Sequence, residues 1–527
     1  MTMTVSTELT VGIVILYLLL IIGIGYYGYR KTKKVEDYMV AGRYTHPIIL
    51  ALSYGASFIS TSAIIGFGGT AAQYGMSLMW LTVFGIIVGV IIAFIFLGKR
   101  IRKTGKALGA MTYPELLGKM YGSKKLIYAT GLIFIAAMPL YTAAVLIGGA
   151  RFIETTLSIS YMTALLGFAG IVALYVIIGG LMAVMYTDAV QGAIMLIGMG
   201  ILLVLTYILL GGVTAANSAL ESMSGLVPDN LAAIGMTGWT SMPEFGSPIW
   251  MTVITTLVLG VGIGVLAQPQ LAVRFMTAKD GKTLNRAIPI GALFIVMMTG
   301  VAFTVGPLTN VYFMNTTGQL AIDAAGGNID SIIPLYINSS MPELFVIIFM
   351  LTLLSAAMST LSSLLHTMGT TLGGDIFSRM RGERYSIRAT RIGIAIMLIV
   401  SVILAVIMPG SIIARATAMF MGLCTAALLP AFIHGITAKN PSYLAGKWSV
   451  AVGAGGWLIW TLFCHLAESK MLGICHTLFG VDSLVGSPWC YLDPLVVGVV
   501  LSVGVLIILI PLDKHKVTRE EQLSMSR

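Results

Sequence analysis

Residues 351–367 of this 527-residue chain read LTLLSAAMSTLSSLLHT, an apolar segment that is dense in hydroxyl groups. Ser359, Ser362 and Ser363 are spaced i, i+3 and i+4, so a helix presents them on one face. Such hydroxyls either bond back to a carbonyl of their own helix or bind a polar partner across the helix boundary. A polar face on an apolar helix therefore predicts a second polar element opposite it.

Two other segments have the composition of interrupted helices. The first, LSYGASFISTSAIIGFGGTAAQYG at 52–75, combines hydroxyls with four interior glycines, and the second, VLGVGIGVLAQPQLAVRF at 258–275, has three glycines before Gln268-Pro269. Pro269 has no N–H and frees a carbonyl one turn earlier. Glycine alone more often marks close packing of membrane helices. Non-helical backbone in a membrane is tolerated only where it is buried in protein or lines a cavity.

The composition of the chain indicates that these elements lie in a membrane. The chain is 57% hydrophobic and 10% charged, whereas soluble domains carry about 25% charged residues. A span needs about 20 apolar residues, and the first apolar run, 10–29, is too long for a signal peptide and predicts a retained span. Thirteen spans are predicted, at 9–29, 47–72, 76–98, 125–149, 160–185, 189–212, 247–273, 284–309, 342–374, 388–408, 411–436, 445–467 and 491–512.

The basic residues give these spans an orientation. With the N-terminus outside and the C-terminus in the cytoplasm, 28 of the 31 Lys and Arg residues fall in cytoplasmic segments, as the positive-inside rule requires. The predicted outer loops 213–246 and 310–341 contain no Lys or Arg. The net charge of +10 is therefore a sign of topology, and a nucleic-acid partner is not expected.

The two interrupted spans are five spans apart, which suggests two five-helix units of opposite orientation. Interrupted helices at matching places in two halves indicate a secondary transporter with its site near the bilayer midplane. The predicted division is a first helix and loop at 1–46, one repeat at 47–212, a second at 213–437, and two further spans with a short tail at 438–527.

Several motifs in this order resemble the sodium:solute symporter family, and within it the sodium/proline symporter branch. The strongest are GARFIETTLSISYMTALLG (149–167), IIGGLMAVMYTDAVQGAIM (177–195), AQPQLAVRFMTA (267–278) and LSAAMSTLSS (354–363). The resemblance implies a LeuT-type fold of five plus five inverted helices, with one helix before the repeat and more after it. It implies alternating-access transport of a solute with Na⁺.

The resemblance also implies where Na⁺ binds. The expected ligands are the carbonyls of Ala56, Ile59 and Ala356 and the hydroxyls of Ser359 and Thr360. Na⁺ is a hard cation that, like Ca²⁺ and Mg²⁺, takes oxygen ligands. Neutral ligands bury no net negative charge and keep the affinity low enough for release.

A second ion position follows less directly from the same resemblance. In some relatives an aspartate and nearby hydroxyls hold a second Na⁺, and the matching residues are Asp188, Ser359, Ser362 and Ser363. The alternative is that these hydroxyls bond back to their own helix and that Asp188 faces cytoplasmic water. In either case Asp188 is expected to lie on the Na⁺ exit path. Thr352 and Ser355 are expected to bond back to their own helix, and His366 to be packed or hydrogen-bonded rather than a proton carrier.

The solute is expected beside the two interruptions. The candidate residues are Ser57, Ser60, Thr61, Tyr141, Val261, Val265, Gln268 and Pro269. The proline branch carries an acidic residue where this chain has Phe58, and Trp and Tyr where it has Val261 and Val265. These departures put proline in doubt and favour a more aliphatic pocket.

We therefore predict a non-enzymatic, multi-pass transporter of the plasma membrane that couples Na⁺ to a small amino acid or monocarboxylate. Its partners are the solute, Na⁺ and the bilayer, with no organic cofactor and a monomer as the functional unit. The alternative on the same fold is H⁺ coupling through Asp188 or His366. An intramembrane enzyme is disfavoured because no GxSxG or HExxH motif occurs. A transport-inactive receptor is disfavoured because only about 15 residues follow the last predicted span.

The four cysteines have no metal-site spacing. Cys475 and Cys490 fall in a predicted outer loop, where they either form a disulfide or remain two free thiols.

Overall fold

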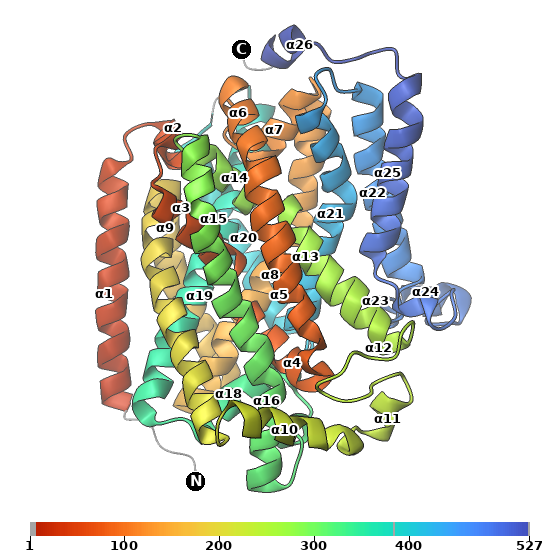
Figure 1. Cartoon of the computed structure of the whole chain (residues 1–527). Coiled ribbons are helices and arrows are strands. Elements are labelled where there is room, and N and C mark those ends of the chain that lie inside the picture. The colour runs from red at the N-terminus through yellow and green to blue at the C-terminus, as the bar shows by residue number, and fades with distance from the viewer. Residues whose placement is uncertain (1–6, 383–384, 525–527) are drawn as a thin grey trace.

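The computed structural model describes residues 7–382 and 385–524, and apart from two isolated β-bridges their regular elements are helices (Figure 1). Within those ranges ten helices are long and apolar enough to cross a membrane, or eleven if a pair bent by 71° is one span. Pro47–Phe58 and Tyr161–Ala173 are shorter apolar helices. The predicted all-helical membrane architecture is confirmed, while the number thirteen stays a prediction.

The helices fall in the following order. The first half contains α1 (Thr7–Lys31), α2 (Val35–Val40), α3 (Pro47–Phe58), α4 (Phe67–Tyr74), α5 (Met79–Ile86), α6 (Lys99–Ala107), α7 (Tyr113–Met120), α8 (Lys124–Leu157), α9 (Tyr161–Leu209), α10 (Val213–Ser222) and α11 (Asp229–Ala232). The second half contains α12 (Pro248–Met251), α13 (Gly260–Gly264), α14 (Pro269–Thr277), α15 (Gly281–Ile295), α16 (Val301–Thr317), α17 (Ala321–Ala324), α18 (Ile332–Ser340), α19 (Glu343–Gly369), α20 (Ile387–Ile407), α21 (Ile413–Thr437), α22 (Tyr443–Phe463), α23 (Leu466–Leu472), α24 (Ile474–Phe479), α25 (Pro494–Leu512) and α26 (Arg519–Ser524). Wider π-helical turns at Ser62–Gly66, Ile87–Gly98, Thr252–Leu259, Val296–Gly300 and Thr370–Ser378 continue several of them.

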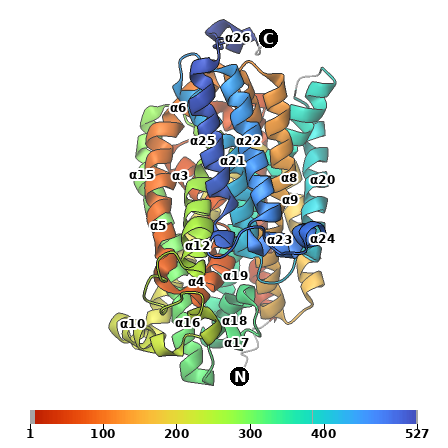
Figure 2. The same ribbon diagram turned by 90° about the vertical axis from the view of Figure 1, so that its right-hand side faces the viewer.

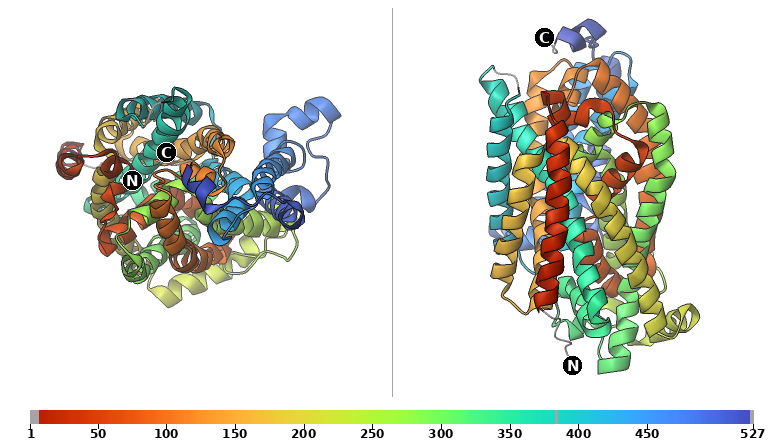
Figure 3. Two further views of the ribbon diagram at one scale, coloured as in Figure 1. Left: turned by 90° about the horizontal axis from the view of Figure 1, so that it is seen from above. Right: turned by 90° about the vertical axis from the view of Figure 1, so that its left-hand side faces the viewer.

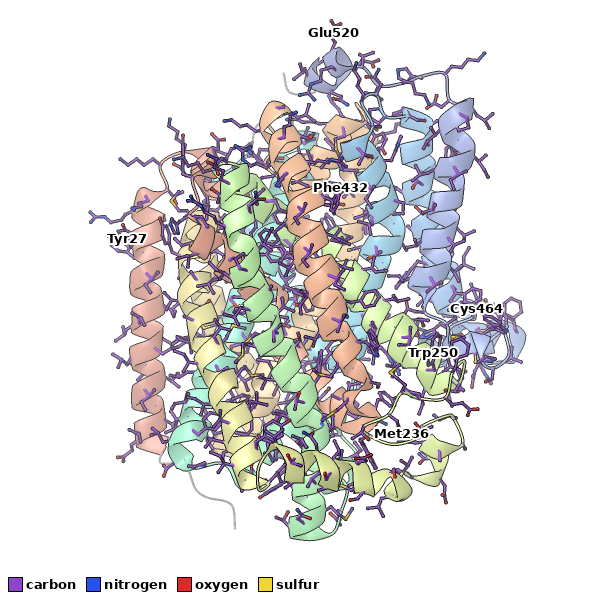
Figure 4. All side chains as sticks on the ribbon, in the orientation of Figure 1. Tyr27, Met236, Trp250, Phe432, Cys464 and Glu520 are labelled. Atoms are coloured by element: carbon purple, nitrogen blue, oxygen red, sulfur yellow. The ribbon has the colours of Figure 1, made fainter. Side chains whose placement is uncertain are left out.

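The two ends of the bundle are formed by different sets of short helices. Helices α2, α6, α7 and α26 lie at one end, and α10, α11 and α18 lie at the other (Figure 1). Glu520 of α26 and Cys464 after α22 are correspondingly far apart along the bundle (Figure 4). The segments predicted to be cytoplasmic thus gather at one end and the predicted outer loops at the other.

The junction between the fifth and sixth predicted spans lies earlier than expected. The prediction put it at 186–188, but α9 is interrupted at Gly180, whose φ of 67° and ψ of 170° are not helical. Only glycine adopts this conformation readily, because it has no Cβ. Asp188 therefore lies inside the second helical part of α9, where it is fully buried, and the expectation that it faces cytoplasmic water is wrong.

The C-terminal helices form a pair of their own. Helices α22 and α25 pack along each other and against α21, and seen from above they project from the rounded bundle (Figures 2 and 3). Helix α22 turns sharply into α23.

Helix α1 lies at the opposite rim of the bundle (Figure 3). Only 17% of its most apolar window is buried. Its buried Tyr17 hydroxyl accepts hydrogen bonds from Ser355 Oγ (3.1 Å) and Gln191 Nε2 (3.2 Å) and donates to Met358 Sδ (3.8 Å). Tyr17 thereby links a mostly exposed helix to α9 and α19 through hydrogen bonds, and Ser355 bonds to Tyr17 instead of back to its own helix, contrary to the prediction.

A short 3₁₀ turn, Ile329–Ser331, lies in the predicted outer loop 310–341. Asp330 Oδ2 accepts hydrogen bonds from the N–H groups of Ile412 (3.1 Å) and Ile413 (3.5 Å), at the start of α21. The carbonyl of Ile329 lies so close to α4 that a Cβ on Gly69 would come within 2.2 Å of it. Gly69 therefore serves close packing, and the interruption of this span lies elsewhere.

The buried carboxyl group of Asp330 makes the stability of the contact between this turn and α21 depend on pH. Burial raises its pKa from 3.8 to about 6, against the lowering effect of the hydrogen bonds to Ile413 and Ile412. Between these values the folded state binds more protons than the unfolded state, so this group's contribution to stability falls as pH rises. We expect the melting temperature of wild type relative to Asp330→Asn to fall between about pH 4 and pH 6.5, by an amount equivalent to at most about 3 kcal/mol.

Thermal unfolding in detergent micelles measures this difference. The exposed Asp229 lies in another predicted outer loop, so Asp229→Asn serves as the matched control. A difference between wild type and Asp330→Asn that is constant across this pH range contradicts the prediction.

The four cysteines are free thiols in the structure. Cys475 Sγ is 3.6 Å from the carbonyl oxygen of Phe463, and Cys490 is buried separately. Of the two alternatives for the outer loop, the structure agrees with free thiols.

Candidate functional site

The first predicted interruption lies at Ile59. Helix α3 ends at Phe58, and Ile59 is extended with φ −91° and ψ 111°. The helical hydrogen-bond ladder stops there, with the Ile59 N–H on the carbonyl of Gly55 (2.8 Å). The next carbonyl along the chain, that of Ala56, is thus available to a partner outside α3.

That partner is the hydroxyl pair on α19. The Ala56 carbonyl accepts hydrogen bonds from Ser359 Oγ (2.9 Å) and Thr360 Oγ1 (3.1 Å). Ser359 Oγ also lies 3.2 Å from the carbonyl oxygen of Ala356. These four residues are fully buried, and Ile59 completes the predicted set only three residues after Ala56. The polar face of α19 therefore contacts the interrupted helix, as the hydroxyl pattern requires.

The arrangement has the donor atoms that a hard cation needs. A hydroxyl has two lone pairs and a rotatable hydrogen, so Ser359 and Thr360 are able to turn their hydrogens away and present oxygen. Together with backbone carbonyls this gives a neutral oxygen cluster in the protein interior. A monovalent cation fits such a cluster, whereas a divalent cation would leave more charge uncompensated.

The neighbouring hydroxyls of α19 divide into two kinds. Ser362 Oγ and Ser363 Oγ both donate to the carbonyl of Ser359 (3.0 and 2.8 Å). Thr352 Oγ1 donates to the Ile348 carbonyl (3.0 Å), as predicted. Ser363 also has partners on other helices, so only it extends the polar face beyond Ser359.

A fully buried ion pair adjoins this cluster of oxygen atoms. Arg274 Nη2 is 2.7 Å from Asp188 Oδ2 and 2.6 Å from Ser363 Oγ, and Arg274 Nε is 2.9 Å from Ser53 Oγ. Ser53 Oγ and Ser57 Oγ donate to the same carboxylate oxygen (2.8 and 3.2 Å). Both charged side chains are 0% exposed. The pair therefore joins α3, α9, α14 and α19.

Sequence reasoning missed Arg274. It counted Arg274 among the basic residues of a cytoplasmic segment, because Arg274 comes directly after the predicted span 247–273. In the structure α14 begins at Pro269 after the extended Gln268, so the predicted interruption is confirmed. Arg274 Nη1 donates to the Gln270 carbonyl one turn earlier (2.9 Å).

His366 lies on the same helix as the hydroxyl pair, and its side chain contacts Tyr38. Its Nε2 is 3.2 Å from the Tyr38 carbonyl oxygen, and its ring packs at 5.5 Å from the Tyr38 ring. The expectation of a packed, hydrogen-bonded histidine is confirmed.

A small cavity of about 20 Å³ adjoins the first interruption, which is roughly enough for one water molecule. Its lining is mainly apolar and aromatic and comes from both halves of the chain: Phe58, Ile59, Ser60, Ser62, Ala63, Phe67, Leu81, Gly85, Tyr141, Val261, Thr299, Phe303, Thr417 and Met421. Tyr141 is the only one of these residues with an ionisable side chain. The cavity thus offers hydroxyls and backbone groups, and no fixed charge, to a guest.

Three of the predicted solute residues line this cavity, namely Ser60, Tyr141 and Val261. The Tyr141 hydroxyl lies 3.3 Å from Ser60 Oγ and 3.3 Å from the Phe58 carbonyl oxygen. Ser62 Oγ is buried and has no hydrogen-bond partner in the structure. Such an unsatisfied group is costly unless a guest supplies the partner.

The other predicted solute residues have different surroundings. Ser57 is bonded to Asp188, and Thr61 Oγ1 donates to the Val145 carbonyl (2.8 Å). Val265 packs near Gly89, and Gln268 Oε1 accepts a hydrogen bond from the Gln270 side chain. Pro269 begins α14. The structure places Phe58, already noted as a departure from the proline branch, in the lining. It also adds Thr417, which no spacing rule identified, because the cavity forms only where helices distant in sequence meet.

Comparison with known proteins finds one matching family and several related symporters. The profile of the family described as "Sodium:solute symporter family" matches residues 38–441. A sodium/pantothenate symporter of Haemophilus influenzae is 29% identical over 482 residues, which cover 88% of this chain and 94% of the relative. Sodium/proline symporter 2 of Staphylococcus saprophyticus is 28% identical over 486 residues, with 90% and 89% covered. A sodium/proline symporter of Staphylococcus aureus is 30% identical over 374 residues, with 70% and 68% covered.

A solved structure has the same fold. A Na⁺-coupled sialic acid symporter, described in a substrate-bound outward-open state with a novel Na⁺ site, superposes with a TM-score of 0.72 at 17% identity. The alignment covers 97% of this chain and 98% of that protein. At this identity the likeness concerns the fold, and the ligands of that protein are its own.

Proposed function

The chain belongs to the sodium:solute symporter family, and we propose that it imports a small organic solute with Na⁺ by alternating access. It is a multi-pass protein of the cell membrane, and the relatives compared here are transporters. The observation that carries the proposal is the contact of Ser359 and Thr360 with the free carbonyl of Ala56. This contact joins an interrupted helix of one half to an intact helix of the other at a neutral oxygen cluster.

In this proposal Na⁺ binds to the carbonyls of Ala56, Ile59 and Ala356 and the hydroxyls of Ser359 and Thr360. Because α3 and α19 both contribute ligands, the ion holds them together. A conformation in which they separate binds Na⁺ more weakly. Solute and Na⁺ affinity are then coupled through the same conformational equilibrium, and the coupling is reciprocal. Asp188, whose carboxylate accepts a hydrogen bond from Ser57 beside Ala56, lies on the path by which the ion would leave.

The proposed solute is a small amino acid or monocarboxylate. The cavity beside the interruption supports this class, because its lining is apolar with hydroxyls from Ser60, Ser62 and Tyr141. Pantothenate and proline, in the names of the relatives, are both carboxylic acids. A polyhydroxylated sugar would need more amides and charges than this lining provides.

The proposed architecture is thirteen spans with the N-terminus outside and the C-terminus in the cytoplasm. Repeats at 47–212 and 213–437 are each built around one interrupted helix, and a helix at 1–46 and a pair at 438–527 lie outside them. The interruptions at Ile59 and Gln268 support this division.

Uptake by proteoliposomes tests the proposed function. The purified protein is reconstituted and supplied with a panel of radiolabelled amino acids and monocarboxylates under an inward Na⁺ gradient. We expect one member of the panel to accumulate only when Na⁺ is present. Accumulation driven by a pH gradient in Na⁺-free buffer would contradict Na⁺ coupling and favour H⁺ coupling on the same fold.

A further inference from the structure

A second, larger cavity of about 460 Å³ lies at the end of the bundle that is predicted to be cytoplasmic. Its walls come from three parts of the chain: the turn between α7 and α8 at 121–125, the start of α22, and the tail at 515–524 after α25. It shares no lining residue with the proposed Na⁺ site or the solute cavity. Its volume is sufficient for a phosphate-sized group together with several water molecules.

The tail forms a fixed wall of this cavity. Figure 1 shows the chain crossing from the end of α25 to α26 above the bundle. The buried Val517 donates its N–H to the carbonyl of Pro441 (2.9 Å), shortly before α22. Gln522 Nε2 donates to the carbonyl of Met120 (3.0 Å), at the end of α7. The tail is thus bonded to both sides of the cavity, which is formed before any ligand arrives.

The uncompensated charge in the lining is positive. Lys124 and Lys125 are exposed, and among the described residues neither forms an ion pair. Glu521, the one carboxylate among the described lining residues, has both oxygens engaged. Its Oε2 accepts from the Thr518 N–H (2.7 Å), and its Oε1 is 3.1 Å from His515 Nε2. An anion would therefore supply the charge that this lining lacks.

The cavity lies at the ends of three helices that are apolar enough for a membrane. Helices α8 and α22 begin at its edge, and α25 ends shortly before the tail that closes it. Such a position corresponds to the depth of the lipid headgroups. Basic cavities between helices on the cytoplasmic side of a membrane bind anionic headgroups.

We propose that this cavity binds the phosphate group of an anionic ligand, either a lipid headgroup or a soluble phosphate. Lys124 and Lys125 bind the phosphate oxygens as point charges, and the Tyr443 hydroxyl supplies a neutral donor. The bound phosphate would join α8 to the tail and to α22, and so hold the C-terminal pair of helices on the first repeat. The proposal goes beyond the transport function and does not depend on Na⁺ coupling.

Equilibrium binding of ³²P-labelled probes to the purified full chain tests this site. The probes are phosphatidylglycerol in mixed detergent micelles and orthophosphate at constant ionic strength. We expect one saturable site per chain for at least one probe, with its affinity about 10-fold or more lower in Lys124→Gln/Lys125→Gln. Lys124→Arg/Lys125→Arg keeps both charges and should retain binding. The replaced side chains are exposed, so these variants should fold.

The matched control is Lys103→Gln/Lys106→Gln. These two lysines are exposed and lie in the same predicted cytoplasmic segment, but they do not line the cavity. We expect the control to bind as wild type does, and the probe that binds more tightly identifies the source of the phosphate. Absence of saturable binding for both probes, or an equal loss of affinity in the two glutamine pairs, overturns the proposed site.

Discussion

Replacing Ser359 with alanine is expected to raise the Na⁺ concentration for half-maximal uptake by roughly 10-fold or more. The change removes one of the proposed ligand oxygens and leaves the Ala56 carbonyl with one hydroxyl partner instead of two. A hydrogen-bonding group that interacts with a charge contributes about 1.5–3 kcal/mol, and each 1.4 kcal/mol is a factor of about ten in affinity. Thr360→Ala should act in the same direction.

The matched control is Ser355→Ala, one turn away on the same buried helix. Ser355 Oγ donates to Tyr17 and not to the interrupted helix, so its loss should affect stability more than Na⁺ dependence. The measurement is initial uptake by proteoliposomes over a range of Na⁺ concentrations. If Ser359→Ala and Ser355→Ala share the wild-type Na⁺ dependence, the assignment of the Na⁺ site is wrong.

Replacing Thr417 with tryptophan is expected to lower uptake at least about 10-fold while Na⁺ binding remains. Thr417 lines a cavity of only about 20 Å³ and is 2% exposed. An indole there fills the space that a solute needs, and overfilled interiors must rearrange to accept the extra volume. The proposed Na⁺ ligands lie outside α21, so ²²Na⁺ binding should persist.

Thr417→Val is the control, because it keeps the volume of the side chain and removes only the hydroxyl. That hydroxyl donates to the Ile413 carbonyl of its own helix (2.9 Å), so its loss should leave most of the uptake intact. Uptake and ²²Na⁺ binding are measured on the same preparations, with the solute identified by the panel. Wild-type uptake by Thr417→Trp would show that the solute binds elsewhere.

Local chemistry in the sequence was sufficient to locate the second interruption. Gln268-Pro269 lacks one N–H and follows three glycines, which together favour a break, and the helix is interrupted there. The glycines of the first interrupted span were less informative, because the break is at Ile59 while Gly69 serves close packing. A glycine permits both a break and close approach, and only the neighbouring chain decides between them.

The partners of the buried charges could not be predicted from the sequence. Helical periodicity predicts which residues of α19 share a face, and it correctly indicated a polar partner for that face. It carries no information on which distant helix supplies that partner. Arg274 lies at the end of an apolar run, where a snorkelling or cytoplasmic arginine is the usual outcome, and only the packing of α14 against α3 and α9 reveals the ion pair.

The attachment of α1 through Tyr17 has a consequence for biogenesis. Tyr17 enters the membrane 174 residues before Gln191 and 338 residues before Ser355, the two side chains that donate to its hydroxyl. A hydroxyl without partners in hydrocarbon is unfavourable, so α1 gains little from docking before α9 is made. The hydrogen bond from Ser355 also requires α19, which is synthesised much later. The first helix in the chain therefore completes its polar contacts only after these later helices have been made.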